Sequence, residues 1–235
     1  MAGAATQTTS REGGPAMSLL DFVRGPAIEI AIAIFVGGVL WRLASLLLLP
    51  WTSDRSARRA DAPHAVVGAF RGFVRHLWPA NTYLRASLFS TVNGYVFHVG
   101  LAIIVFGLAQ HILFLRGLFG FSWPNLPTGV ISAASVVTLA SLLAALARRM
   151  TNPVLRLLST LDDYFSWLVT FLPVATGLIA VSHLWAPYET LLSVHILAVC
   201  LFLIWFPFGK LMHAFLVFLT RSETGIFYSR RGVEI

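Results

Sequence analysis

The chain consists of long apolar stretches separated by short polar segments. Five stretches are predominantly apolar over roughly the 20 residues that a membrane helix needs, at 28–50, 88–115, 128–147, 163–184 and 190–219. None shows the strict alternation of a membrane β-strand, and backbone groups in lipid must form hydrogen bonds within their own segment. The pattern predicts an all-α integral membrane protein with a bundle of five transmembrane helices.

The composition excludes a soluble domain as the main body of the protein. Of the 235 residues, 57% are hydrophobic and only 11% are charged, which is too few to cover the surface of a soluble domain of this length. Cys200 is the single cysteine, so a disulfide framework and a thiolate-bound cluster are excluded. The sequence also lacks Cys-x-x-Cys-His, the motif for covalent haem attachment.

The net charge of +7 reflects membrane topology and not a nucleic-acid partner. The arginines gather in alternate polar segments: Arg55, Arg58, Arg59, Arg71, Arg75 and Arg85 between spans one and two, Arg148, Arg149 and Arg156 between three and four, and Arg221, Arg230 and Arg231 after span five. Arg116 is alone between spans two and three, and the next outer loop has no Lys or Arg. The positive-inside rule predicts a multi-pass membrane protein with its amino terminus outside and its carboxyl terminus in the cytoplasm, which in a bacterial inner membrane places the amino terminus in the periplasm.

This topology divides the chain into three parts. We expect a flexible tail at 1–24, a five-span domain at 25–219 with a basic cytoplasmic loop at 51–87, and a cytoplasmic tail at 220–235. Basic segments of this kind attract anionic membrane lipid or a soluble partner subunit. Thr160, Asp162 and Asp163 predict the start of the fourth helix, because acidic side chains favour the positive end of the helix dipole.

Four histidines lie on the second and fifth spans. His195 and His213 are 18 residues apart, or five helical turns and ~27 Å, on one face of the last span. Since spans two and five are antiparallel, His98 lies level with His213 and His111 with His195. Imidazoles within a membrane indicate a functional site, and pairs of this kind are typical of haem b with two axial histidines. The pattern predicts two haems b.

His111 fits this arrangement less simply than the other three. It follows His98 by 13 residues, which places the two imidazoles ~140° apart around an ideal helix. Local unwinding near Gly100 or Gly107 would correct this phase, and His183 is the alternative ligand. Pro207 predicts a kink between His195 and His213. His64 and His76 lie in the polar loop and are interpreted as ordinary surface residues.

Arg42, within span one, needs an anion or must extend to the membrane surface. A haem propionate, a quinone headgroup and simple extension to the surface remain open for it. The glycines Gly94, Gly100 and Gly107 suit either close approach of a flat macrocycle or ordinary helix packing.

The segments Phe97-His98-Val99-Gly100 and Phe206-Pro207-Phe208-Gly209-Lys210-Leu211-Met212-His213 resemble the gamma subunit family of respiratory nitrate reductase. The resemblance extends over roughly 88–219. It implies five spans, two haems b and electron exchange with quinone. Because the histidines of span two are farther apart than in the nitrate reductase subunit, it points to a branch paired with heterodisulfide-reductase-like or sulfite-reductase-associated iron–sulfur subunits.

By this resemblance, quinol or quinone reacts near the outer haem and a cytoplasmic iron–sulfur subunit of a respiratory complex exchanges electrons with the inner one. The polar residues available at the outer site are Arg116, His183, Tyr188 and Glu189, of which His183 and Glu189 can move protons. The chain alone would not act on a soluble substrate. A membrane transporter and a cofactor-free membrane anchor are the competing interpretations.

Overall fold

The computed structural model describes residues 17–50, 56–182 and 184–233. Within these residues the regular elements are helices, with no strand. Five of the helical segments are long and apolar enough to cross a membrane: Leu19–Leu47, Asn81–Gly107, Thr128–Thr151, Leu161–Ser182 and Tyr188–Trp205. The predicted fold class, an all-α membrane protein with five transmembrane helices, is confirmed.

The first span joins α1 (Leu19–Phe22), a π-helical turn (Val23–Ala27) and α2 (Ile28–Leu47). The others, with the shorter helices between them, are α3 (Ala65–Arg75), α4 (Leu84–Gly107), α5 (Ala109–Phe119), α6 (Thr128–Thr151), α7 (Pro153–Leu158), α8 (Leu161–Ser182), α9 (Tyr188–Trp205) and α10 (His213–Arg231). Among the described residues of the predicted tail 1–24, residues 19–24 are helical. The boundary predicted at residue 24 therefore falls inside the first span.

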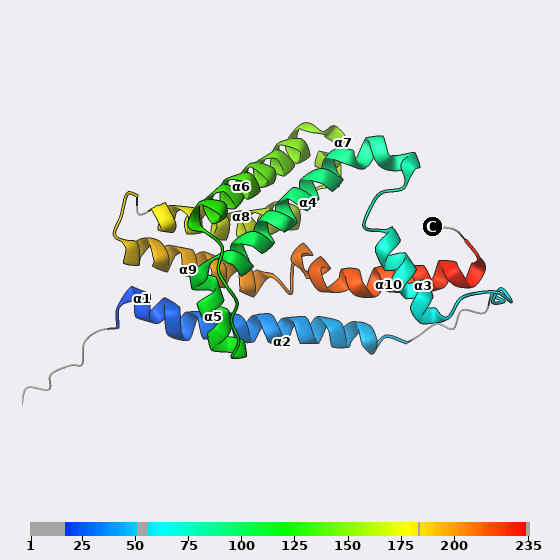
Figure 1. The fold of residues 1–235 in the computed structure, drawn as a ribbon, viewed down its shortest axis with the longest axis horizontal. Coiled ribbons are helices and arrows are strands. Elements are labelled where there is room, and N and C mark those ends of the chain that lie inside the picture. The colour runs from blue at the N-terminus through cyan, green and yellow to red at the C-terminus, as the bar shows by residue number, and fades with distance from the viewer. Residues whose placement is uncertain (1–16, 51–55, 183, 234–235) are drawn as a thin grey trace, which may run out of the picture.

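The spanning helices pack in the order α4, α6, α8, α9, α2 (Figure 1). Polar contacts join the first three: Asn93 and Ser141 exchange three hydrogen bonds between α4 and α6, and Trp167 of α8 donates to the Leu142 carbonyl at 2.8 Å. Such hydrogen bonds contribute about 1 kcal/mol or less each in membranes. Close approach matters as well, because a Cβ at Gly100 would overlap the Thr138 hydroxyl of α6.

Most of the surface of the spans faces outward. The share of each apolar window that is buried within the protein ranges from 11% to 28%. Large apolar side chains such as Leu40 and Trp41 are exposed on α2. A soluble protein cannot expose this much contiguous apolar surface, so the outward faces contact membrane lipid.

Two of the predicted spans are each broken into two helices. The second, predicted to run to residue 115, ends at Gly107, where Leu108 takes an extended conformation before α5 begins. The fifth, predicted to run to residue 219, ends at Trp205 and resumes as α10 at His213. The intervening residues 206–212, here called the break, contain Pro207, whose fully buried ring packs against Gly38 of α2. The predicted kink at Pro207 is thus a complete interruption of the helix.

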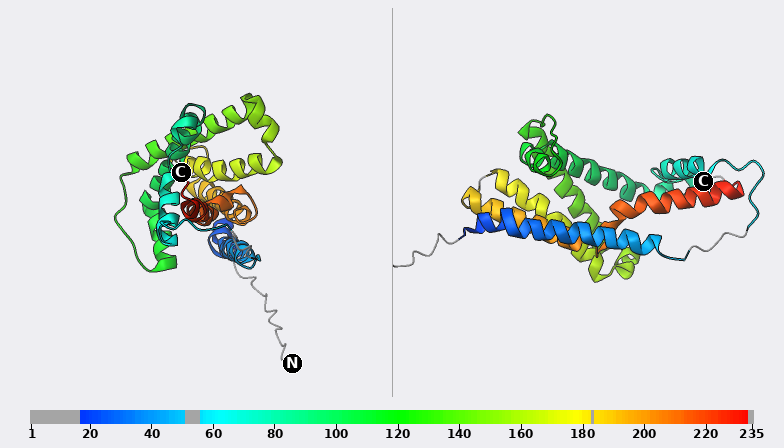
Figure 2. Two further views of the ribbon diagram at one scale, coloured as in Figure 1. Left: turned by 90° about the vertical axis from the view of Figure 1, so that its right-hand side faces the viewer. Right: turned by 90° about the horizontal axis from the view of Figure 1, so that it is seen from below.

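The polar segments 51–87 and 220–235, predicted as a loop and a tail, contain much helix in their described parts. α3 lies antiparallel against α10 and projects with it from one end of the bundle (Figure 2). Gly68 and Gly72 of α3 meet Gly225 of α10 so closely that a Cβ at Gly72 or Gly225 would overlap the other helix, and one at Gly68 would press against Ser229. Three glycines therefore create a backbone-to-backbone contact, the small-residue packing by which helices associate tightly.

The two ends of the bundle differ in charge. At one end α2 and α6 finish, α4 and α8 begin, and α3 and α10 project; it carries, among others, Arg71, Arg75, Arg148, Arg149 and Arg221. We call this the Arg-rich end. The opposite, Arg-poor end carries Arg24 on the π-helical turn and Arg116 on α5.

Candidate functional site: two histidine pairs between antiparallel helices

His98 of α4 and His213, the first residue of α10, face one another. Their ring centroids are 6.1 Å apart and their ring planes are nearly perpendicular, at 86°. His213 reaches this position because the break ends directly before it, so that α10 starts beside α4. This pair is the one nearer to the Arg-rich end.

His111 and His195 form a second pair nearer to the Arg-poor end. Their ring centroids are 6.2 Å apart and their planes are nearly parallel, at 22°. His111 lies on α5, so the interruption at Leu108 removes the phase difference that one continuous helix would impose. Gly177 of α8 leaves room for His195, because a Cβ there would lie 3.0 Å from His195 Cε1. The structure thus brings together both pairs that the sequence suggested, with His111 opposite His195. The alternative ligand His183 lies outside the described residues.

Both distances suit two axial ligands of one metal ion. A metal–nitrogen bond to imidazole is about 2 Å long and the nitrogen lies about 1 Å from the ring centre, so two axial imidazoles have ring centres about 6 Å apart. Within the described part of the chain, no group of three or more His, Cys, Asp or Glu side chains could hold a metal ion by itself. Two opposed imidazoles instead suit a metal whose other four ligands come from a macrocycle, as in haem.

The second nitrogen of each imidazole is already held by the protein. Nδ1 of His98 contacts the Gly94 carbonyl at 2.7 Å, that of His111 the Ile104 carbonyl at 3.0 Å and that of His213 the Lys210 carbonyl at 2.8 Å. A carbonyl can only accept, so Nδ1 carries the proton in these three and Nε2 keeps its lone pair. Metal-binding histidines show this arrangement, in which a second group fixes the tautomer and orients the ring.

His195 contacts the hydroxyl of Thr176 as well as the backbone of Pro173. Its Nδ1 lies 3.3 Å from Thr176 Oγ1, whose own proton is donated to the Leu172 carbonyl at 2.7 Å. The Thr176 oxygen is therefore free to accept the Nδ1 proton of His195. All four histidines have Nδ1 occupied, which leaves Nε2 of each for a ligand.

The glycines near the pairs serve different purposes. An added Cβ at Gly100 would collide with Thr138 of α6, and one at Gly107 would collide with Leu126 and Ile131. Helix packing therefore explains both glycines. A Cβ at Gly94, one turn from His98, would meet nothing within 4 Å. The space beside His98 is thus compatible with a flat group approaching this face of α4.

A cavity of about 680 Å³ opens beside His213 at the Arg-rich end. Its apolar wall includes Met212, Leu216 and Val217, and its charged lining includes Arg42 and Arg221. Lys210 also lines it, but the ammonium is paired with Asp163 at 2.5 Å. Arg42 therefore borders a cavity that could receive a carboxylate. Such an anion would compensate the charge of this arginine within span one.

Of the four residues predicted for quinone, the three that the structure describes lie on α5 and α9, toward the Arg-poor end. Arg116 is exposed in the last turn of α5, and Tyr188 and Glu189 are exposed in the first turn of α9. His183 lies outside the described residues. His64 caps α3 through Nδ1, and His76 bonds the Gly72 carbonyl at 2.6 Å, so both have local roles.

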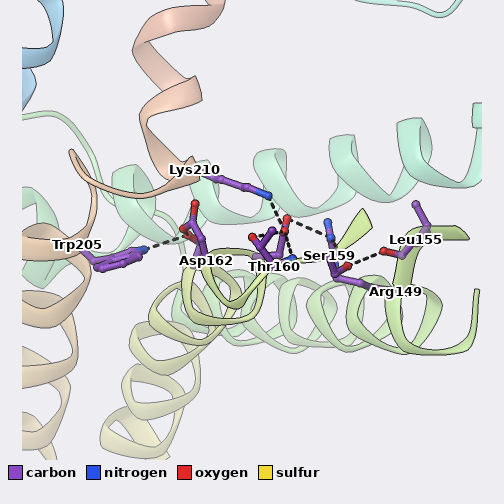
Figure 3. A network of polar contacts seen from close by, with 9 residues as sticks. Arg149, Leu155, Ser159, Thr160, Asp162, Trp205 and Lys210 are labelled. Carbon is purple, nitrogen blue, oxygen red and sulfur yellow. Dashed lines mark hydrogen bonds and ion pairs between the residues drawn. The ribbon is translucent and has the colours of Figure 1, made fainter. Parts of the chain in front are cut away.

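Sequence reasoning did not anticipate the ion-pair network around Asp163. Its carboxylate accepts from Lys210 at 2.5 Å and Arg149 at 3.1 Å, and from the backbone N–H of Thr160 at 2.9 Å. Figure 3 labels these three partners, which converge from α6, the start of α8 and the break. The cap at Thr160 was readable locally, because Asp163 stands three residues after it. Lys210 is 47 residues away in the chain, and no local signal connects the two.

A comparison with known proteins supplies a relative. The chain is 35% identical over 214 residues to a protein of Nitratidesulfovibrio vulgaris strain Hildenborough, an alignment that covers 90% of this chain and 94% of that one. The two belong to one family. The relative's name states no activity, so the family is defined here by sequence alone. No family model matches the chain, and no solved structure matches it.

Proposed function

We propose that this protein is a dihaem b-type cytochrome subunit of the bacterial inner membrane that carries electrons between quinone and an iron–sulfur partner. The observation that carries the proposal is the presence of two imidazole pairs, each at the spacing of axial ligands and each with Nδ1 held by the protein. When bound, each haem iron would take up and release one electron. The resemblance to the gamma subunit family of nitrate reductase supports the same conclusion.

The histidines would bind the haem irons, and two arginines would bind the haem carboxylates of one pair. His98 and His213 would hold one haem, and His111 and His195 the other, and ligation by two histidines would suit electron transfer rather than oxygen binding. Arg42 and Arg221 line the cavity beside His213 and would hold the carboxylates of that haem.

The absorption spectrum of the purified, dithionite-reduced protein tests this function. We expect a b-type α-band and, by pyridine haemochrome assay, two haems per chain released without covalent attachment. A transporter or a cofactor-free anchor would show neither. A ratio near one would retain the cytochrome and refute the second haem.

The Arg-rich end is the proposed docking surface for the cytoplasmic iron–sulfur subunit. α3 exposes Val66, Phe70 and Val74 in one stripe, with Arg71 and Arg75 beside it. A second cavity, of about 630 Å³, lies between this helix and the residues after α10 and is lined by Phe70, Arg71 and Arg75. Apolar anchors flanked by arginine suit a partner with an acidic, partly apolar surface.

Reversing one charge on this surface should weaken the partner. We expect Arg71→Glu to lower the salt concentration at which an iron–sulfur subunit dissociates during copurification, because the ion pairs that guide docking are screened by salt. Arg24→Glu is the matched control, since it makes the same charge change on an exposed arginine at the Arg-poor end. Equal loss of the partner in both variants would refute the surface, and recovery of periplasmic partners alone would reverse the proposed orientation.

A further inference from the structure

Asp163 stands at an unusual position for a charged residue. It lies in the first turn of α8, and its side chain is only 7% exposed. Removing a carboxylate from water is costly unless cations and hydrogen bonds compensate, and Asp163 has all of these: Lys210, Arg149 and both the N–H and the hydroxyl of Thr160. Capping α8 needs only Thr160. The pairing with Lys210 therefore calls for a separate explanation.

Lys210 connects Asp163 to a proposed haem ligand. It begins the short 3₁₀ turn Lys210–Met212 within the break, and its carbonyl accepts the Nδ1 proton of His213 at 2.8 Å. The break lacks a continuous helical hydrogen-bond ladder, so its path depends on contacts to neighbouring helices. Asp163 is such a contact, and it holds the residue whose carbonyl orients His213.

A second contact fixes the other side of the break. Trp205 Nε1 donates to Ser166 Oγ at 3.0 Å, and Ser166 donates to Asp162 at 2.8 Å (Figure 3). Gly209 packs so closely on Trp205 and Ser166 that it has no room for a side chain. α8 thus holds the break at two points, through the neighbouring carboxylates Asp162 and Asp163, but only Asp163 reaches Lys210.

We propose that Asp163 is a positioning residue that acts through Lys210 on His213 and thereby tunes the haem of the His98/His213 pair. The inference rests on the proposed function. A carbonyl held firmly against Nδ1–H makes the imidazole a stronger donor to iron and favours the ferric state. Loosening the carbonyl therefore raises the midpoint potential of that haem and leaves the His111/His195 haem unchanged.

Redox titration of three variants separates positioning from simple charge. Asp163→Asn keeps the cap at Thr160 but loses the ion pair, and should raise the potential of one haem. Lys210→Met breaks the same link while removing a positive charge, so positioning raises the potential, whereas charge alone lowers it. Asp162→Asn removes a negative charge from the same turn of α8 without touching Lys210, and should give a clearly smaller rise than Asp163→Asn.

A conservative variant and a spectroscopic signal complete the test. Lys210→Arg retains the ion pair, so its midpoint potential should equal that of the unsubstituted protein. The ferric electron paramagnetic resonance signal of the His98/His213 haem should change in Asp163→Asn and Lys210→Met, and stay unchanged in Lys210→Arg. Selective loss of that haem in these two variants, with the other haem retained, supports the proposal in a stronger form. A downward shift in Lys210→Met, or equal shifts in Asp162→Asn and Asp163→Asn, overturns it. Absence of haem from the unsubstituted protein instead overturns the proposed function itself.

Discussion

Replacing His213 by alanine should remove one haem of two and leave the other in place. His98→Ala should lose the same haem as His213→Ala, because the two residues form one pair. His111→Ala and His195→Ala should both lose the other haem. In each variant the affected haem would keep only one of its two protein ligands. The pyridine haemochrome assay should fall from two haems per chain to one in each variant.

The two haems should be distinguishable by spectroscopy, which identifies the one that is lost. Near-perpendicular axial imidazoles, as in the His98/His213 pair at 86°, give a ferric signal with a large maximal g value, and near-parallel ones, as in the other pair at 22°, give a rhombic signal. His76→Ala is the control, since His76 bonds Gly72 of α3 and Arg221 of α10 and lies in neither pair, and both haems should remain. Loss of both haems from every variant, or of neither from His213→Ala, would refute the pairing.

The sequence was sufficient for the spans and for the level of each histidine. Apolar runs determine which segments enter the membrane, and a fixed helical rise determines that His98 lies opposite His213 in antiparallel helices. The structure was needed for the ring distances and for the two helix interruptions that place His111 and His213 opposite their partners. The ligand role of the four histidines stays a prediction until haem is measured.

The helix ends and the projecting helices could not be predicted in the same way. α10 continues to Arg231 through a polar sequence because three glycines allow it to pack on α3, and this contact joins residues more than 140 positions apart. The interruption at Leu108 follows Gly107, whose position is fixed by the loop residue Leu126 and by Ile131 of α6. Neither effect has a local pattern in the sequence. The ion pair between Asp163 and Lys210 could not be predicted either, because it joins residues 47 positions apart.

Quinol should deliver electrons first to the haem of the His111/His195 pair. By the family resemblance the quinone site lies near the outer haem, and the candidate residues Arg116, Tyr188 and Glu189 lie at this end of the bundle. In His213→Ala, a quinol analogue should therefore still reduce the remaining haem rapidly. In His195→Ala, reduction of the remaining haem should be slow, because the electron must cross the bundle without its first acceptor.

Proton release gives a second test of the same site. Quinol oxidation releases protons, and Glu189 and His183 are the proposed acceptors, so Glu189→Gln and His183→Ala should slow haem reduction by on the order of a hundredfold while haem content stays at two per chain. Glu223→Gln, an exposed carboxylate on α10, is the matched control. Stopped-flow reduction, followed at the α-band, measures the rate separately from assembly.

The results of these measurements distinguish between possible locations of the quinone site. Loss of haem in His183→Ala would make His183 a ligand or the support of one, in competition with His111. Normal rates in both variants would exclude the Arg-poor end, and the cavity beside His213 would then be the site to test next, because it combines an apolar wall with Arg42 and Arg221. In that case Arg42→Gln should slow quinol oxidation, and His213→Ala rather than His195→Ala should block the entry of electrons.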